Sequence, residues 1–176
     1  EVAFAEGVSR DNRLGFRVDL GFGKTADLVA ASEPEEDGQE IYKHFQQAYL
    51  SLLTGKVQWD VGRFVTPVGA EVIESQDNWN YTRSVLFGYA IPFNHTGVRA
   101  TVSASDQVAL TAFLLNGWNN GSDLGGDKTV ALSAIVKPLP SLTWYATYMG
   151  GKEVEDGDFR NLFDTTVSFA LSRKLT

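Results

Sequence analysis

The chain has 176 residues, of which 43% are hydrophobic and 12% aromatic, enough for one domain with a sizeable core. Its formal charge of −7, with no cluster of Lys and Arg, argues against a nucleic-acid partner. The chain has no cysteine, which excludes disulfides and thiolate chemistry, and no apolar run reaches the roughly 18 residues of a membrane-spanning helix.

Alternation of apolar and polar residues with a period of two predicts an all-β chain with a single domain over residues 1–176. In "GFRVDLGFG", large apolar residues from Phe16 to Phe22 alternate with Arg17, Asp19 and glycines. The segment 42–53 also has a helical reading. We predict strands at residues 1–8, 13–29, 43–53, 56–66, 91–103, 107–118, 128–137, 141–149 and 161–172.

The connections between these strands alternate strictly between short and long. Short turns such as "TGK" and "PLP" are followed each time by a long segment, the longest being residues 67–90. This order is typical of an antiparallel up-and-down transmembrane β-barrel, whose tight turns and long loops lie on opposite sides of a membrane.

Aromatic residues support the same orientation, because membrane barrels carry aromatic girdles at both lipid headgroup levels. The residues on the apolar side of the strands fall into two predicted belts. One contains Phe16, Trp59, Trp144 and Phe169, and the other contains Phe22, Tyr148 and Phe163.

The opposite face of the strands is rich in charges, hydroxyls and glycines, and it resembles a wetted wall more than a packed core. We therefore expect these residues to line a lumen. The candidate pore-lining residues are Arg17, Asp19, Gln47, Asp60, His95, Arg99, Tyr145 and Asp164.

Two positions do not fit a regular barrel strand. Arg63 falls on the lipid-facing side, so we expect either a bulge near Gly62 and Arg63 or a guanidinium that meets lipid phosphates. The strand from Val108 to Leu115 is apolar on both faces, with Phe113 and Leu115 on the inner side.

The central segment contains a run of specific motifs, which are FVTP (64–67), GAEVIES (69–75), DNWNYTRS (77–84), FGYAIPF (87–93) and HTGVR (95–99). With these motifs, and with weaker similarity over nearly the whole chain, the sequence resembles the OmpL-like β-barrel porins of Gram-negative outer membranes. The resemblance implies a bacterial outer-membrane location, contacts with outer-membrane lipids and lipopolysaccharide, and a homo-oligomer, often a trimer. It also implies a larger barrel, of which about nine strands are present here, so we expect truncation at both ends.

The sequence contains no convincing enzyme or cofactor motif. "GFGKT" lacks the first glycine of a phosphate-binding loop, because that position is Val18 within an alternating strand. The two histidines, His44 and His95, have no metal-binding spacing. We expect no catalytic residue, no metal and no cofactor.

The long connection 67–90 is the strongest candidate for a functional loop. We expect it to fold into the lumen as a constriction, with its charged residues opposed to Arg17, Arg99 and Arg63 across the opening. An external cover loop held by its aromatic residues is the alternative. The expected constriction residues are Glu71, Glu74, Asp77 and Arg83.

These features predict an outer-membrane porin that passes ions and small hydrophilic solutes by diffusion. Two alternatives remain. The first is an outer-membrane barrel whose lumen is plugged and that holds a partner protein. The second is a soluble all-β binding module with Phe16, Val18 and Leu20 in its core.

Overall fold

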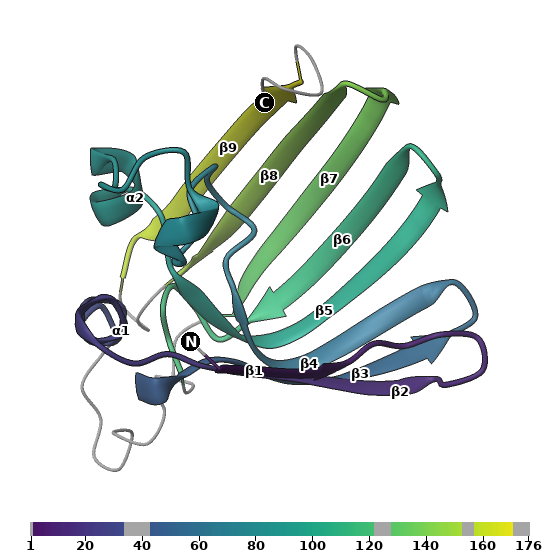
Figure 1. Cartoon of the computed structure of the whole chain (residues 1–176), viewed down its shortest axis with the longest axis horizontal. Coiled ribbons are helices and arrows are strands. Elements are labelled where there is room, and N and C mark those ends of the chain that lie inside the picture. Colours follow the sequence, from purple (N-terminus) through teal and green to yellow (C-terminus); the bar gives the residue numbers. More distant parts are fainter. Residues whose placement is uncertain (1, 34–42, 122–127, 153–156, 171–176) are drawn as a thin grey trace.

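The computed structural model describes residues 2–33, 43–121, 128–152 and 157–170. Nine antiparallel strands form one curved sheet, in which each strand pairs with the next along the chain (Figure 1). The strands are β1 (Val2–Glu6), β2 (Leu14–Leu20), β3 (Phe45–Thr54), β4 (Val57–Val65), β5 (Asn94–Ser105), β6 (Val108–Leu115), β7 (Thr129–Leu139), β8 (Leu142–Lys152) and β9 (Phe159–Phe169).

The predicted meander and its alternation of short and long connections are confirmed. The turns at residues 55–56, 106–107 and 140–141 are tight, whereas residues 21–44, 66–93 and 116–128 form long connections on the opposite side. Parts of the first and third long connections, and most of the connection before β9, lie outside the described residues. The strand β3 occupies Phe45–Thr54, so the alternative helical reading of this segment is wrong.

The prediction of one strand over residues 13–29 is wrong beyond Leu20. Helix α1 (Lys24–Ala30) follows instead, and Gly23 at its start has a φ of 92° that a strand residue does not adopt. Gly21 and Gly23 end the strand, and α1 then buries Val29. Phe22 therefore lies outside β2, beside the ring of His44 at 5.4 Å.

The sheet is open, since β1 and β9 do not pair with each other. Because nine strands alternate in direction, β1 and β9 run the same way. Residues that face each other across neighbouring strands lie progressively further along the strands. Followed from partner to partner, Trp59, the third residue of β4, leads to Tyr148, the seventh residue of β8. Tilted strands of this kind are what a barrel wall requires.

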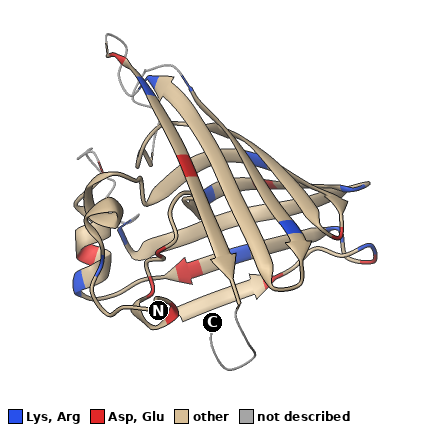
Figure 2. Cartoon of the chain, turned by 90° about the horizontal axis from the view of Figure 1, so that it is seen from above, with Lys and Arg blue, Asp and Glu red and all other residues tan. Residues whose placement is uncertain are grey.

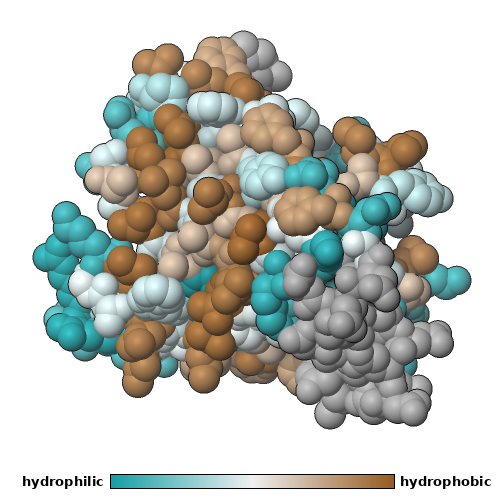
Figure 3. Space-filling model, turned by 180° about the vertical axis from the view of Figure 1, so that it is seen from behind, coloured by the Kyte–Doolittle hydropathy of each residue, from teal (hydrophilic) through white to brown (hydrophobic). Residues whose placement is uncertain are grey.

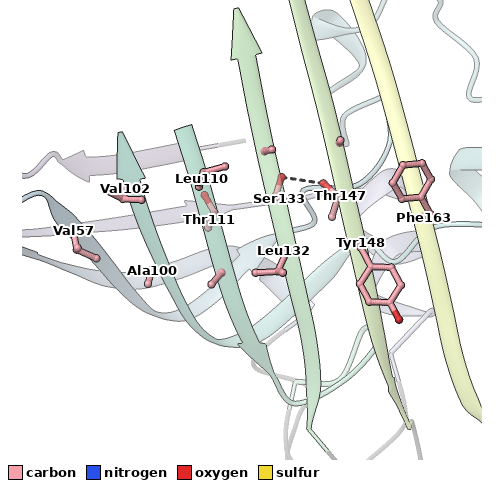
Figure 4. Close-up of a pocket in the computed structure, with 13 residues that line it drawn as sticks. Val57, Ala100, Val102, Leu110, Thr111, Leu132, Ser133, Thr147, Tyr148 and Phe163 are labelled. Carbon is pink, nitrogen blue, oxygen red and sulfur yellow. Dashed lines mark hydrogen bonds between the residues drawn. The ribbon is translucent and has the colours of Figure 1, made fainter. Parts of the chain in front are cut away.

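The convex face of the sheet is apolar and exposed. Figure 3 shows hydrophobic side chains over the middle of the face seen from behind. Small residues, among them Ala100, Ala112, Ala134 and Ala146, line an open hollow of about 520 Å³ there, with Tyr148 and Phe163 at one end (Figure 4). None of the described helices is long and apolar enough to cross a membrane.

The connection from β4 to β5, residues 66–93, carries the 3-10 helix η2 (Ser75–Asp77) and the helix α2 (Val85–Tyr89). It lies on the concave side of the sheet (Figure 1). Two apolar clusters hold it. Val68 joins a cluster on the strands, and Ile73 and Phe87 join Val29 of α1 and Phe93.

Candidate functional site

The concave face of β2 and β3 carries a group of hydrogen-bonded polar side chains. Asp19 Oδ2 accepts a hydrogen bond from Arg17 Nε at 2.7 Å and another from Gln47 Nε2 at 2.5 Å. Asp19 is fully buried by these neighbours, whereas the Arg17 side chain is 42% exposed. We expected both residues to meet water in a lumen; the Arg17 side chain is exposed, whereas that of Asp19 is buried.

A second group on β3, β4 and β5 centres on Asp60. Its Oδ1 accepts from Ser51 Oγ at 2.6 Å and Gln58 Nε2 at 2.9 Å, and its Oδ2 accepts from Arg99 Nε at 2.7 Å. Three donors from three strands thus satisfy one nearly buried carboxylate. Charge-assisted bonds of this kind stabilise an ionised acid away from bulk water.

The Arg99 guanidinium is held from several sides. Its central carbon lies 4.9 Å from the ring centroid of Tyr49 and 4.6 Å from that of Phe64, which is cation–π distance. The neighbouring inner-face positions are the paired glycines Gly62 and Gly97. A Cβ at either position would clash with the backbone of the adjacent strand, so a larger residue does not fit. Gly62 also has a φ of 137°, a conformation that favours glycine.

Further along the sheet the concave face becomes apolar, and the long loop covers it. Val68 is 2% exposed in a cluster with Phe64 and with four strand residues. This cluster explains why the strand 108–115 is apolar on both faces: its inner side is the seat of the loop. The strand residues of this apolar seat are Phe113, Leu115, Ala131 and Met149.

Two hydrogen bonds tie the loop to the far side of the sheet. Gly69 N donates to Asp164 Oδ2 on β9 at 3.1 Å, and Thr147 Oγ1 on β8 donates to Pro67 O at 3.4 Å. Gly69 has a φ of 90°, and a Cβ there would lie 2.8 Å from Ile91. The loop therefore crosses the concave side from β4 to β9 as a strap, and Asp164 is one of its anchors.

Three of the four residues expected at the constriction bind within or beside the loop. Glu71 accepts from Ser84 N at 3.0 Å, Glu74 accepts from Gln46, and Arg83 donates to Ile73 O at 2.7 Å. Asp77 is exposed. Glu71, Glu74 and Arg83 therefore hold the loop in place. Arg17 and Arg99 pair with Asp19 and Asp60 on the strands.

Both expectations for Arg63 are wrong. The pairing on either side of β4 is continuous at Gly62 and Arg63, so no register shift occurs there. The guanidinium is nearly buried, bonds to both oxygens of Glu33 after α1, and donates to Phe45 O at 2.7 Å. Glu33, 30 positions earlier in the chain, thus buries the Arg63 charge, which the alternation of β4 had placed on the lipid-facing side.

His95 lies on the inner face but is fully buried, so it does not line open space. Its ring nitrogens lie 3.1 Å from Gly117 O and 3.2 Å from Thr66 Oγ1. Nearby, Asn119 Oδ1 accepts from Phe93 N and Asn94 N, and Asn119 has a φ of 60°. Asn119 is not among the residues predicted from the sequence, because its local signal is limited to the turn-like "NGWNN".

The remaining predicted residues lie on the expected sides of the sheet. Tyr145 is on the concave face, paired with Ile135 and Thr166, and is 38% exposed. Figure 2 shows isolated charged residues within strands that are otherwise uncharged. Apart from Phe22, the expected girdle residues lie on the convex face of their strands and are exposed; they are Phe16, Trp59, Trp144, Tyr148, Phe163 and Phe169.

Comparison with known proteins identifies the family. Searches of curated proteins and of solved structures return no match. The family model described as "Putative beta-barrel porin-2, OmpL-like" matches residues 2–176, which agrees with the nine-stranded antiparallel meander, its apolar convex face and its polar concave wall. The chain belongs to this family of OmpL-like β-barrel porins.

Proposed function

We propose that this chain forms part of the wall, and the constriction, of an outer-membrane channel through which ions and small hydrophilic solutes diffuse. The observation that carries the proposal is the division of one sheet into two faces. Exposed apolar side chains cover the convex face, whereas hydrogen-bonded charged side chains and a long loop occupy the concave face. That division suits lipid outside and water inside.

The strap formed by residues 66–93 is the proposed constriction. It narrows the space in front of β6, β7 and β8, because Val68 occupies the apolar seat there. Solutes then pass along the remaining wall, whose partly open charges are Arg17 and Arg99. Both arginines are paired with aspartates, so we expect weak ion selectivity rather than a strong preference for one sign.

Conductance of the full-length protein tests this proposal. We expect stepwise current increases in planar bilayers and swelling of liposomes in small neutral solutes. Heat-denatured protein is the control, because it reveals leakage that does not depend on the fold. Absence of both conductance and swelling in correctly folded protein would refute a diffusion channel.

A plugged barrel is the second candidate, because the strap and its apolar cluster already fill part of the concave side. In that case the protein inserts into membranes but carries no current, and removal of the strap opens it. No enzymatic activity is part of either proposal. We propose contacts with outer-membrane lipids and lipopolysaccharide, and a homo-oligomer, on the basis of the family.

The proposed location has a simple biochemical test. The apolar convex face requires detergent or lipid for solubility. We expect precipitation when detergent is removed, and quenching of the exposed Trp59 and Trp144 by lipids with brominated acyl chains. A monodisperse protein without detergent would instead support a soluble β-sheet protein.

A further inference from the structure

The strap carries three aromatic side chains that are almost fully exposed. Trp79 is 86% exposed, Tyr81 is 89% exposed and Tyr89 on α2 is 91% exposed. The expected girdle aromatics on the convex face range only from 40% to 68%. Fully presented Trp and Tyr rings on a loop are typical of recognition surfaces, since each ring combines an apolar face with a polar group.

The turn that carries Trp79 and Tyr81 is fixed on its N-terminal side by Asn78. Its Oδ1 accepts from Val72 N at 2.9 Å, and its Nδ2 donates to Val72 O at 2.9 Å and to Glu74 O at 2.7 Å. One side chain thus closes the loop immediately before Trp79.

The C-terminal side of the turn is fixed by Arg83 and Ser84. The Arg83 guanidinium donates to Ile73 O at 2.7 Å and lies 5.2 Å from the ring centroid of Phe87. Ser84 N donates to Glu71 at 3.0 Å. Residues 79–82 therefore form the tip of a turn closed on both sides, and a preorganised turn loses little conformational entropy when it binds a ligand.

The turn also has a fixed place in the fold. Phe87 packs on Phe93 with ring centroids 5.0 Å apart, in the cluster that contains Val29 and Ile73. This cluster joins the strap to α1 at the end of the sheet that carries the long connections (Figure 1). The turn is therefore held at the end of the sheet that carries the long connections.

The polar residues around the rings indicate the class of solute. Asn80 and Thr82 alternate with Trp79 and Tyr81 and are exposed, so they can donate and accept hydrogen bonds. Arg83, the nearest cation in sequence, is engaged by Ile73 and Ser75. A pyranose ring matches this surface, because it has apolar C–H faces for stacking and hydroxyl edges for amides.

We propose that Trp79 and Tyr81 form a stacking surface that captures neutral carbohydrate at the mouth of the channel. The proposal rests on the proposed channel function and specifies a class of solute for it.

The test uses the full-length protein and maltotriose. In planar bilayers we expect maltotriose to interrupt the KCl current. The double variant Trp79→Ala/Tyr81→Ala should bind the sugar about four- to hundredfold more weakly, since each stacked ring contributes about two- to tenfold. Trp79→Phe/Tyr81→Phe should keep the interruption. Leu86→Ala is the matched control, because Leu86 is an exposed apolar residue of the same strap without a ring.

Calorimetric titration of maltotriose into the detergent-solubilised protein separates this proposal from the channel itself. Binding that requires the two rings supports the stacking surface even if no current is found. Wild-type protein that neither binds maltotriose nor shows current interruption overturns the proposal, as does a double variant with wild-type affinity. Equal interruption by a polyethylene glycol of similar mass would also overturn it, because that polymer has no pyranose ring.

Discussion

The concave face of this single sheet is built in two different ways. On β2 to β5 it carries Asp19 and Asp60 with their hydrogen-bonded partners, whereas on β6 to β8 it carries Phe113, Leu115 and Met149 beneath Val68. In both regions successive side chains point to opposite faces of the sheet. The two regions differ in what packs on them. The strap lies on β6 to β8 and leaves part of the face of β2 to β5 open. The inner face of this sheet is therefore apolar where Val68 of the strap packs on it.

The largest expected effect comes from disrupting the apolar seat with Val68→Asp. An unpaired charge in an apolar site costs on the order of 3 to 5 kcal/mol, so the strap should leave the sheet. We expect a higher single-channel conductance and faster tryptic cleavage after Arg83. Val72→Asp is the control, because Val72 lies on the same strap and is 43% exposed. Unchanged conductance and cleavage in the Val68 variant would contradict a seated strap.

The polar region is tested next by Asp60→Asn, which removes the charge that Arg99 faces at 2.7 Å. Hydrogen bonds to charged groups contribute about 1.5 to 3 kcal/mol, and we expect a loss toward the lower value because Arg99 is partly exposed. The thermal unfolding midpoint in detergent should fall. The reversal potential in a KCl gradient should shift toward anions, since Arg99 becomes an unpaired cation.

Asp106→Asn in the exposed turn between β5 and β6 is the matched control for this charge change. A shift of the same size in both variants would mean that Asp60 has no special place on the permeation path.

A smaller effect is expected for Asp164→Asn, which weakens one of the two bonds that hold the strap to the far strands. The bond to Gly69 N is 3.1 Å long, and the seat of Val68 remains, so we expect a loss of about 1 kcal/mol and noisier open-channel current. Asp158→Asn, at an exposed position just before β9, should leave the current noise unchanged. Equal noise in the two variants would argue against Asp164 as an anchor.

The smallest effects are expected for Glu71→Gln and Glu74→Gln. Both carboxylates accept hydrogen bonds within or beside the strap, and a glutamine can still accept them, so stability should change by about 0.5 kcal/mol or less. The reversal potential should shift less than in Asp60→Asn. A shift as large as that of Asp60→Asn would instead place these carboxylates on the permeation path, as the constriction hypothesis from the sequence expects.

Local periodicity determined the strands and their order. The alternation around Arg17 and Asp19 correctly separated their face from that of Phe16 and Val18, and the connection lengths correctly predicted an antiparallel meander. Alternation follows from the two-residue repeat of the strand backbone, so it can be read from neighbouring residues. The failure at residues 21–29 arose because two glycines stop a strand whose apolar pattern continues.

Only the tertiary structure decided what covers each face. Glu33 buries Arg63, Asn119 binds the backbone at Phe93, and Val68 seats on strands as distant in sequence as Met149. None of these contacts has a local signature. These contacts depend on the paths of the long connections. A loop has no regular backbone repeat, so its path is set by the surfaces on which it packs and not by a local sequence pattern. The sequence by itself determined a meander of strands with two unlike faces, and the fold decided which part of the inner face stays open and which part is the seat of the strap.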